Sequence, residues 1–360
     1  MKKCDLLIFD ATLRDGSHAI KHQLELKTVE RYCSCIDDSG LYTVVIGHGN
    51  GLGASSLQVG LSKNTDRDLL LAARKNLRNP KLGVYMIPGF GTIEDNILPA
   101  LDCGVDLFKI GCHCTEADIT KQHIEFLSRR GVEVYGVLMM SHMVSPEELL
   151  IEVQKMESYG AAGVILMDSA GAYLPQNVKE KIELLVANVD IRIGFHAHNN
   201  LGLAVANSLI AIDSGATIID GTLRGFGAGA GNCQLEALIA ILQKQAILSD
   251  INLYNLMDVG DEIVRDEIGY QKGVDSTSII SGLSGVFSAF AVHVKNAAKQ
   301  YGVDPRDIYV ELGKRKVVGG QEDLVVDVAL YLSQNKRKDD ASYVLELSLI
   351  HISEPTRLAL

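Results

Sequence analysis

Apolar and polar positions alternate with two different periods along the first 220 residues of the chain. Short apolar runs rich in β-branched residues are typical of buried strands, and the segments between them, such as Pro146–Ser158 and Asn200–Asp213, repeat their apolar positions every three to four residues, as helices do. The predicted strands are Leu6–Asp10, Tyr42–Ile46, Leu82–Ile87, Val105–Ile110, Val132–Leu138, Gly163–Met167, Ile191–His196 and Thr217–Asp220. The pattern predicts eight consecutive strand–helix units.

Glycine precedes several predicted strands, where the preceding helix has to end with a positive φ. The residues at these positions are Gly40, Gly104, Gly131, Gly160 and Gly215. Eight strand–helix units in about 250 residues match an α/β fold of the (β/α)₈ TIM-barrel type. A doubly wound open sheet is the alternative, but the turn at Thr12–Gly16 lacks the glycine fingerprint that such a sheet carries after its first strand.

No strand pattern follows residue 250. Helical periodicity covers Met257–Asp275, Ser284–Tyr301 and Gln321–Gln334. We predict a TIM-barrel catalytic domain over residues 1–250 and a helical C-terminal subdomain over residues 251–345. Residues 346–360 include the run Ser348–Arg357, which fits no element, and we interpret them as a non-native tail outside the functional protein.

The composition narrows the class of protein. Of 360 residues, 47% are hydrophobic and 22% are charged, which is ordinary for a folded enzyme. The net charge of -11 argues against nucleic acid or an anionic membrane as a partner. No signal peptide is recognisable, and no apolar run approaches the ~20 residues that span a bilayer, so we expect a cytoplasmic protein.

Two closely spaced cysteine pairs occur, Cys33 with Cys35 and Cys112 with Cys114. Zinc sites usually space their cysteines by two to four residues, and seven cysteines in a chain of 360 residues do not form a disulfide framework. We therefore interpret these residues as buried thiols of a reduced protein, with zinc pairs as the alternative.

Polar residues gather where the predicted strands end, which is where TIM barrels place their active sites. Side chains alternate across a strand, so His196 and His198 point to the same face and together can bind one ion. With Asp15 after the first strand they form a two-histidine, one-carboxylate set with open positions. Mn²⁺ or Mg²⁺ suits a substrate held through oxygens, and a Zn²⁺ hydrolase is the alternative. Arg14 beside this set is best explained by an oxyanion of the substrate.

A glycine-rich segment, Gly225–Gly231, follows the last predicted strand. Its backbone N–H groups would suit a phosphate, but a tight turn that allows close helix packing explains it better. We therefore expect a turn here, with the phosphate cradle as the alternative.

Several motifs together resemble the 4-hydroxy-2-oxovalerate aldolase family of the DRE-TIM metallolyases. The segments that carry the resemblance are Thr12–Ile20, Leu138–Met143, Asp168–Ala172, His196–Asn200, Gly227–Asn232 and Glu311–Asp323. The resemblance implies a metal-dependent pyruvate aldolase that cleaves a 4-hydroxy-2-oxo acid to pyruvate and an aldehyde through a pyruvate enolate. Manganese is the implied metal, with Mg²⁺ or Co²⁺ as substitutes.

The same resemblance assigns roles to individual residues. Asp15, His196 and His198 are implied as the metal ligands. Arg14 is implied to stabilise the enolate, His18 to act as the base, and Ser169 to contact the carboxylate of the substrate. These roles agree with the chemistry, since cleavage needs a base for the C4 hydroxyl and a stabilising charge at the oxygen where electrons arrive.

Four residues depart from the family pattern around the expected pocket: Val45, Asn50, Tyr85 and Phe287. Val45 replaces an acidic residue, Asn50 an aspartate and Phe287 a tyrosine, while Tyr85 stands where leucine is frequent. Tyr85 and Phe287 are therefore expected to line the aldehyde side of the substrate site. We predict that the enolate chemistry is retained and that the aldehyde acceptor differs.

Two other functions are compatible with the sequence. One is an acyl-CoA-using lyase or synthase of the hydroxymethylglutaryl-CoA lyase or isopropylmalate synthase type, and the other is a non-catalytic subunit that regulates a dehydrogenase. Intact metal ligands argue against the second alternative. The resemblance also implies an acylating aldehyde dehydrogenase as partner, and hence a homo- or hetero-oligomer around a small 2-oxo acid substrate.

Overall fold

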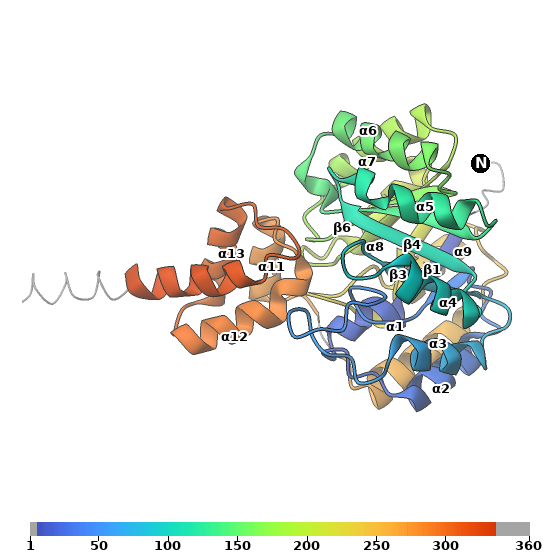
Figure 1. The fold of residues 1–360 in the computed structure, drawn as a ribbon, viewed down its shortest axis with the longest axis horizontal. Coiled ribbons are helices and arrows are strands. Elements are labelled where there is room, and N and C mark those ends of the chain that lie inside the picture. Colours follow the sequence, from blue (N-terminus) through green and yellow to red (C-terminus); the bar gives the residue numbers. More distant parts are fainter. Residues whose placement is uncertain (1–5, 272, 336–360) are drawn as a thin grey trace, which may run out of the picture.

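The computed structural model describes residues 6–271 and 273–335, and within them the chain forms a closed barrel of eight parallel strands, with β1 paired to β8. Figure 1 shows the barrel with the C-terminal helices to one side of it. The strands are β1 (Leu7–Asp10), β2 (Thr43–Val45), β3 (Lys81–Met86), β4 (Leu107–His113), β5 (Glu133–Met139), β6 (Gly163–Asp168), β7 (Arg192–Ala197) and β8 (Ile218–Gly221). The predicted TIM barrel is confirmed, and the strand ends differ from the prediction by a few residues.

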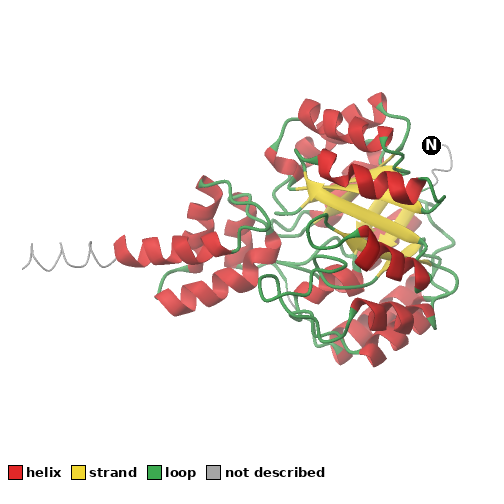
Figure 2. Cartoon of the chain, in the orientation of Figure 1, coloured by secondary structure: helices red, strands yellow, loops and turns green. Residues whose placement is uncertain are grey.

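Helices surround the barrel, and a further group of helices lies to one side of it (Figure 2). Around the barrel are α1 (Thr12–Asp15), α2 (Leu26–Ile36), α3 (Asp66–Arg74), α4 (Leu98–Asp102), α5 (Lys121–Ser128), α6 (Pro146–Ser158), α7 (Pro175–Asn188), α8 (Ala204–Asp213), α9 (Leu235–Lys244) and α10 (Leu253–Val259). The second group contains α11 (Ser276–Leu283), α12 (Ala291–Tyr301), α13 (Pro305–Lys314) and the helical residues 323–335.

Alternation of side chains along the strands creates two apolar layers. Phe9, Leu107 and Ile165 fill the interior of the barrel, whereas their neighbours Ile8 and Phe108 pack between the strands and the surrounding helices. All five glycines predicted to end helices have a positive φ, between +70° and +104°. The alternation of side chains and the glycines that end helices, both visible in the sequence, are therefore consistent with the observed barrel.

The C-terminal helices have a core of their own, which includes Val286, Phe290, Ile308 and Leu312. The chain up to Tyr270 still packs in the core of the barrel, so the change from one core to the other lies between Tyr270 and Val286. The predicted tail, residues 346–360, lies outside the described residues.

Two of the predicted C-terminal helices are wrong in their extent. Met257–Asp275 is not one helix: α10 continues as a π-helical turn at Gly260–Glu267, and the chain then turns at Gly269 with a φ of +80°. Helix α12 begins at Ala291 rather than Ser284. The unpredicted α11 begins where the Asp275 carboxylate accepts the N–H of Ser278, a helix-start signal that the apolar period alone does not reveal.

Candidate active site

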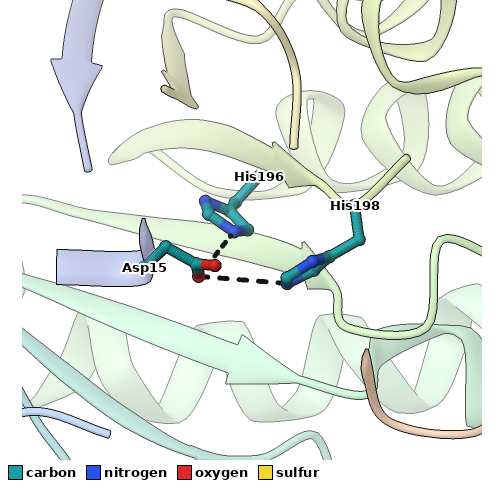
Figure 3. A group of neighbouring side chains, drawn as sticks. All are labelled: Asp15, His196 and His198. Carbon is teal, nitrogen blue, oxygen red and sulfur yellow. Dashed lines mark ion pairs between the residues drawn. The ribbon is translucent and has the colours of Figure 1, made fainter. Parts of the chain in front are cut away.

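The C-terminal ends of β1 and β7 bring three potential metal-binding side chains together. Asp15 ends the short helix α1, His196 lies in β7, and His198 follows that strand on the same side (Figure 3). Oδ2 of Asp15 lies 3.6 Å from Nε2 of His196 and 4.0 Å from Nε2 of His198. Among the described residues this is the one group whose ligand atoms could hold a metal ion, and those atoms lie within 4.8 Å of one another.

Asp15 is fixed from two sides. Its Oδ1 accepts the backbone N–H of Ala228 at 3.1 Å, and its Oδ2 accepts Nη1 of Arg14 at 2.8 Å. Burial alone would raise the pKa of Asp15, but Arg14 and the two imidazoles hold it well below the ordinary value. The carboxylate is therefore ionised, as a metal ligand has to be.

The two histidines have different surroundings. Burial lowers the pKa of His198 to about 4 against the attraction of Asp15, so this imidazole is neutral near pH 7. Burial also disfavours the charged form of His196, but Asp220 and Asp15 on either side raise its pKa. Nδ1 of His196 lies 3.3 Å from Oδ2 of Asp220, which leaves Nε2 facing Asp15.

This arrangement fits a divalent cation. Ligand atoms that each lie about 2.1 Å from one ion are separated by roughly 3–4 Å, which is the range of the two distances that join Asp15 to the histidines. All three side chains are buried, and the set of one carboxylate and two imidazoles leaves coordination positions for a substrate.

Arg14 lies beside the three ligands with part of its hydrogen-bonding capacity unused. Its Nη1 also donates to the carbonyl oxygen of Gly49 at 3.3 Å, and its guanidinium lies over the ring of Tyr85, 4.9 Å from the centroid. Within the described residues, Nε and Nη2 of Arg14 are buried without a hydrogen-bond partner. A buried guanidinium with two unused nitrogens is a binding element for an oxyanion.

His18 lies one helical turn beyond Asp15, in the 3₁₀ turn Gly16–His18. Its ring packs on Gly49, where a Cβ atom would come within 2.4 Å of Nε2. Burial lowers the pKa of His18 to about 3, with Asp15 opposing the shift and Arg14 adding to it. The imidazole is therefore neutral near pH 7, and its burial makes it a weaker base than a free imidazole.

A cavity of about 20 Å³ lies over these residues and is closed by the C-terminal helical region. Its lining includes Arg14, Asp15, His18, His198, Asn50, Tyr85, Phe287 and Ala289. This volume is about that of one water molecule. His18, Ala228 and Ala289 also border a larger cavity of about 420 Å³ between the barrel and the helical region.

Two of the predicted residues lie apart from this cavity. Val45 is buried in the apolar interior of the barrel, and Ser169 is buried at the end of β6, where its Oγ accepts the N–H of Met140 at 2.9 Å. Neither is among the described residues that line the cavity. The carbonyl oxygen of Ser169 accepts the N–H of Ser288 at 2.9 Å and so ties the barrel to the helical region.

The hydroxyl of Tyr85 is occupied by a contact with Met139, another residue that borders the cavity. It donates to Sδ of Met139 at 3.0 Å and fits over Gly111, where a Cβ atom would come within 2.1 Å of the oxygen. The face of the ring remains beneath Arg14. This geometry favours a steric role for Tyr85 over a hydrogen bond to the aldehyde.

The Gly225–Gly231 segment is a turn, as expected. Gly225, Gly229 and Gly231 have a positive φ, and N–H groups of the segment donate to side chains of the protein itself, as Ala230 does to Oδ1 of Asn200 at 3.0 Å.

The cysteines of both close pairs are free thiols.

Sequence reasoning missed Asp220 and Lys109, which lie inside the barrel behind His196. The sequence does carry a signal for both residues, because side chains two positions apart in a strand face the same side. Asp220 lies two residues after the inward-facing Ile218, and Lys109 two residues after the inward-facing Leu107. Charged residues at interior barrel positions need partners, which makes them candidates for a site.

Comparison with known proteins gives two family matches. The HMGL-like family model matches residues 5–263, and the DmpG-like communication domain matches residues 272–334. A 4-hydroxy-2-oxovalerate aldolase of Pectobacterium atrosepticum is 50% identical over 329 residues, which cover 91% of this chain and 96% of the relative. A protein of the same name from Spirochaeta aurantia is 50% identical over 323 residues, which cover 90% and 95% of the two chains.

A solved structure with the same fold is the carboxyl transferase domain of Rhizobium etli pyruvate carboxylase. It superposes with a TM-score of 0.77 at 16% identity, covering 92% of this chain and 61% of that chain. At this identity the similarity concerns the fold alone. In the described part of the chain, no helix combines the length and apolar character needed to cross a membrane.

Proposed function

We propose that this chain, which belongs to the 4-hydroxy-2-oxovalerate aldolase family, cleaves a 4-hydroxy-2-oxo acid such as 4-hydroxy-2-oxovalerate to pyruvate and an aldehyde. The chain is a metal-dependent carbon–carbon lyase, and its relatives favour this activity over an acyl-CoA-using enzyme or a regulatory subunit. The observation that carries the proposal is the buried Arg14, with unused N–H groups, beside the three potential metal ligands.

Asp15, His196 and His198 are the proposed ligands. A bound divalent ion supplies Lewis-acid polarisation of the keto oxygen of a 2-oxo acid. Manganese is the proposed metal, with Mg²⁺ or Co²⁺ as substitutes, because a substrate that binds through oxygens suits these harder ions. The family resemblance assigns Ser169 to the carboxylate of the substrate, a contact that would require a rearrangement at the end of β6, because Ser169 does not border the cavity and its Oγ accepts the N–H of Met140.

The remaining chemistry falls to Arg14 and His18. Cleavage of the C3–C4 bond releases the proton of the C4 hydroxyl while electrons move toward the 2-oxo group. His18 is proposed to accept that proton, and Arg14 to donate hydrogen bonds to the oxygen on which negative charge develops as the pyruvate enolate forms. Both side chains border the cavity over the proposed metal ligands.

Replacement of the base tests this assignment. We expect His18→Ala to slow pyruvate release about 10²–10⁴-fold, the usual contribution of general-base catalysis, while pyruvate binding stays near that of the wild type. Pyruvate release is measured with lactate dehydrogenase and NADH, and pyruvate binding by calorimetry. His293→Ala, in α12, is the control, because this histidine does not border the cavity. Wild-type turnover by the His18 variant would rule out His18 as the base.

Tyr85 and Phe287 are proposed to set the size of the aldehyde. We expect Tyr85→Leu to raise kcat/KM for substrates with longer aldehyde halves. The gain should correspond to roughly 1–3 kcal/mol of transition-state binding for each methylene accommodated. Tyr85→Phe should change little, because the hydroxyl of Tyr85 already has a partner in Sδ of Met139. The measurement compares kcat/KM over a panel of 4-hydroxy-2-oxo acids with different aldehyde halves. An unchanged chain-length preference in Tyr85→Leu would exclude Tyr85 from the acceptor site.

The C-terminal helical region is proposed to contact an acylating aldehyde dehydrogenase. The support is the match of residues 272–334 to the DmpG-like communication domain. The protein would then act in a hetero-oligomer, and a cytoplasmic location would suit such an assembly.

A further inference from the structure

A lysine–carboxylate pair lies inside the barrel behind the metal ligands. Lys109 comes from β4 and Asp220 from β8, and neither has exposed surface. Nζ of Lys109 contacts Oδ2 of Asp220 across the interior of the barrel. Two charges this deep in an apolar core cost several kcal/mol each in lost hydration, so the pair requires a reason beyond stability.

The same oxygen of Asp220 faces a metal ligand. It lies 3.3 Å from Nδ1 of His196, on the opposite side of the imidazole from the Nε2 that faces Asp15. An imidazole that donates Nδ1–H to a carboxylate keeps its lone pair on Nε2 and keeps its ring in one orientation. Asp220 is thus placed to fix both the tautomer and the direction of His196.

We propose that Asp220 is a positioning residue for His196 as a metal ligand, and that Lys109 in turn positions Asp220. The inference deepens the proposed function and rests on its assignment of His196 to the metal. Neither Lys109 nor Asp220 is among the described residues that border the cavity. They therefore act through His196 and do not touch the substrate.

Lys109 is needed because Asp220 cannot rely on the imidazole alone. Asp220 is fully buried, and its charged neighbours on this side are Lys109 and His196. Within the described residues, Oδ1 of Asp220 has no hydrogen-bond partner, so the contact with Lys109 and the approach to His196 both use Oδ2. Loss of Lys109 would leave a buried carboxylate without the partner that holds its Oδ2 toward His196, and free to turn away from the imidazole.

The test measures metal binding rather than turnover. We expect Asp220→Asn and Lys109→Met to weaken Mn²⁺ binding about 10–100-fold, the usual effect of removing an outer partner of a ligating histidine. Mn²⁺ affinity is measured by titration with detection of the free ion by EPR. The visible absorption spectrum of the Co²⁺-loaded variants reports the ligand field, which a general loss of stability would not alter.

A second ion pair in the same barrel provides matched controls. Lys81 contacts Glu133 at the N-terminal ends of β3 and β5, at the opposite end of the strands from His196. Lys81→Met and Glu133→Gln remove the same kinds of charge, and both should keep the wild-type Mn²⁺ affinity and Co²⁺ spectrum. Loss of affinity in these controls as well would reduce the role of Lys109 and Asp220 to stability and overturn the proposal.

The double variant Lys109→Met/Asp220→Asn removes both buried charges, so it remains informative where Lys109→Met alone does not fold. If Lys109 acts through Asp220, the double variant binds Mn²⁺ no more weakly than Asp220→Asn. Additive losses would overturn the role of Lys109, and wild-type affinity in Asp220→Asn would overturn the whole inference. Asp15→Asn tests the proposed metal site separately from the positioning role of Asp220 and Lys109. Unchanged Mn²⁺ binding in that variant would reject the metal site itself.

Discussion

Removal of the divalent ion is expected to abolish pyruvate release from 4-hydroxy-2-oxo acids, and added Mn²⁺, Mg²⁺ or Co²⁺ is expected to restore it. The proposed ligands Asp15, His196 and His198 are buried and converge on one point, and without the ion Arg14 alone of the described groups would remain to stabilise charge on the keto oxygen. Lewis-acid polarisation contributes several kcal/mol, so the loss should be roughly 10³-fold or more.

The experiment uses protein treated with EDTA, dialysed and shown to be free of metal by elemental analysis. Pyruvate release is then followed with and without each added ion. His198→Ala is the matched variant, and added metal should fail to restore its turnover. Full activity in verified metal-free protein would contradict the metal assignment.

Replacement of Arg14 should have the second largest effect. We expect Arg14→Ala to raise the barrier for cleavage by about 3 kcal/mol or more, which is roughly 100-fold in rate, as for other fixed donors to a developing oxyanion. Mn²⁺ affinity should change little, because Asp15 keeps its hydrogen bond from the N–H of Ala228.

Arg14→Lys separates charge from geometry. Lysine retains the positive charge but loses the planar fork, so a rate between those of the wild type and Arg14→Ala is expected. The measurements are kcat and kcat/KM for pyruvate release and Mn²⁺ affinity by titration. Wild-type kcat in Arg14→Ala would show that the oxyanion is stabilised elsewhere.

The fold and the grouping of the three potential metal ligands could be predicted because both follow from local rules. The strand period and the glycines that end helices predict the barrel, and side-chain parity places His196 and His198 on the same side. The convergence of strand ends in a barrel then brings Asp15 to them, although it lies far away in the sequence. The barrel and the group formed by Asp15, His196 and His198 can therefore be predicted without knowing any specific tertiary contact.

Other features depend on contacts that no local pattern specifies. Asp220 pairs with Lys109 because β8 and β4 face each other across the closed barrel, which only the assembled structure reveals. The hydroxyl of Tyr85 turns toward Met139 because Gly111 leaves room for it. The segment that was predicted as one helix from Met257 to Asp275 is broken at Gly269, in a stretch where the apolar period alone gave no stop.

Barrel closure also affects how the protein is made. Asp15 leaves the ribosome with the first strand, and His196 follows after about 180 residues, which is on the order of 10–40 s of translation. Strand β1 pairs with β8, next to β7, so the three ligands meet only when the newest strands dock against the oldest one. If these residues bind the ion as proposed, an ion bound at that point would link the two ends of the nascent barrel and stabilise it by about 2.7 kcal/mol at a hundred times its dissociation constant. Cellular metal supply would thus influence the yield of folded protein as well as its activity.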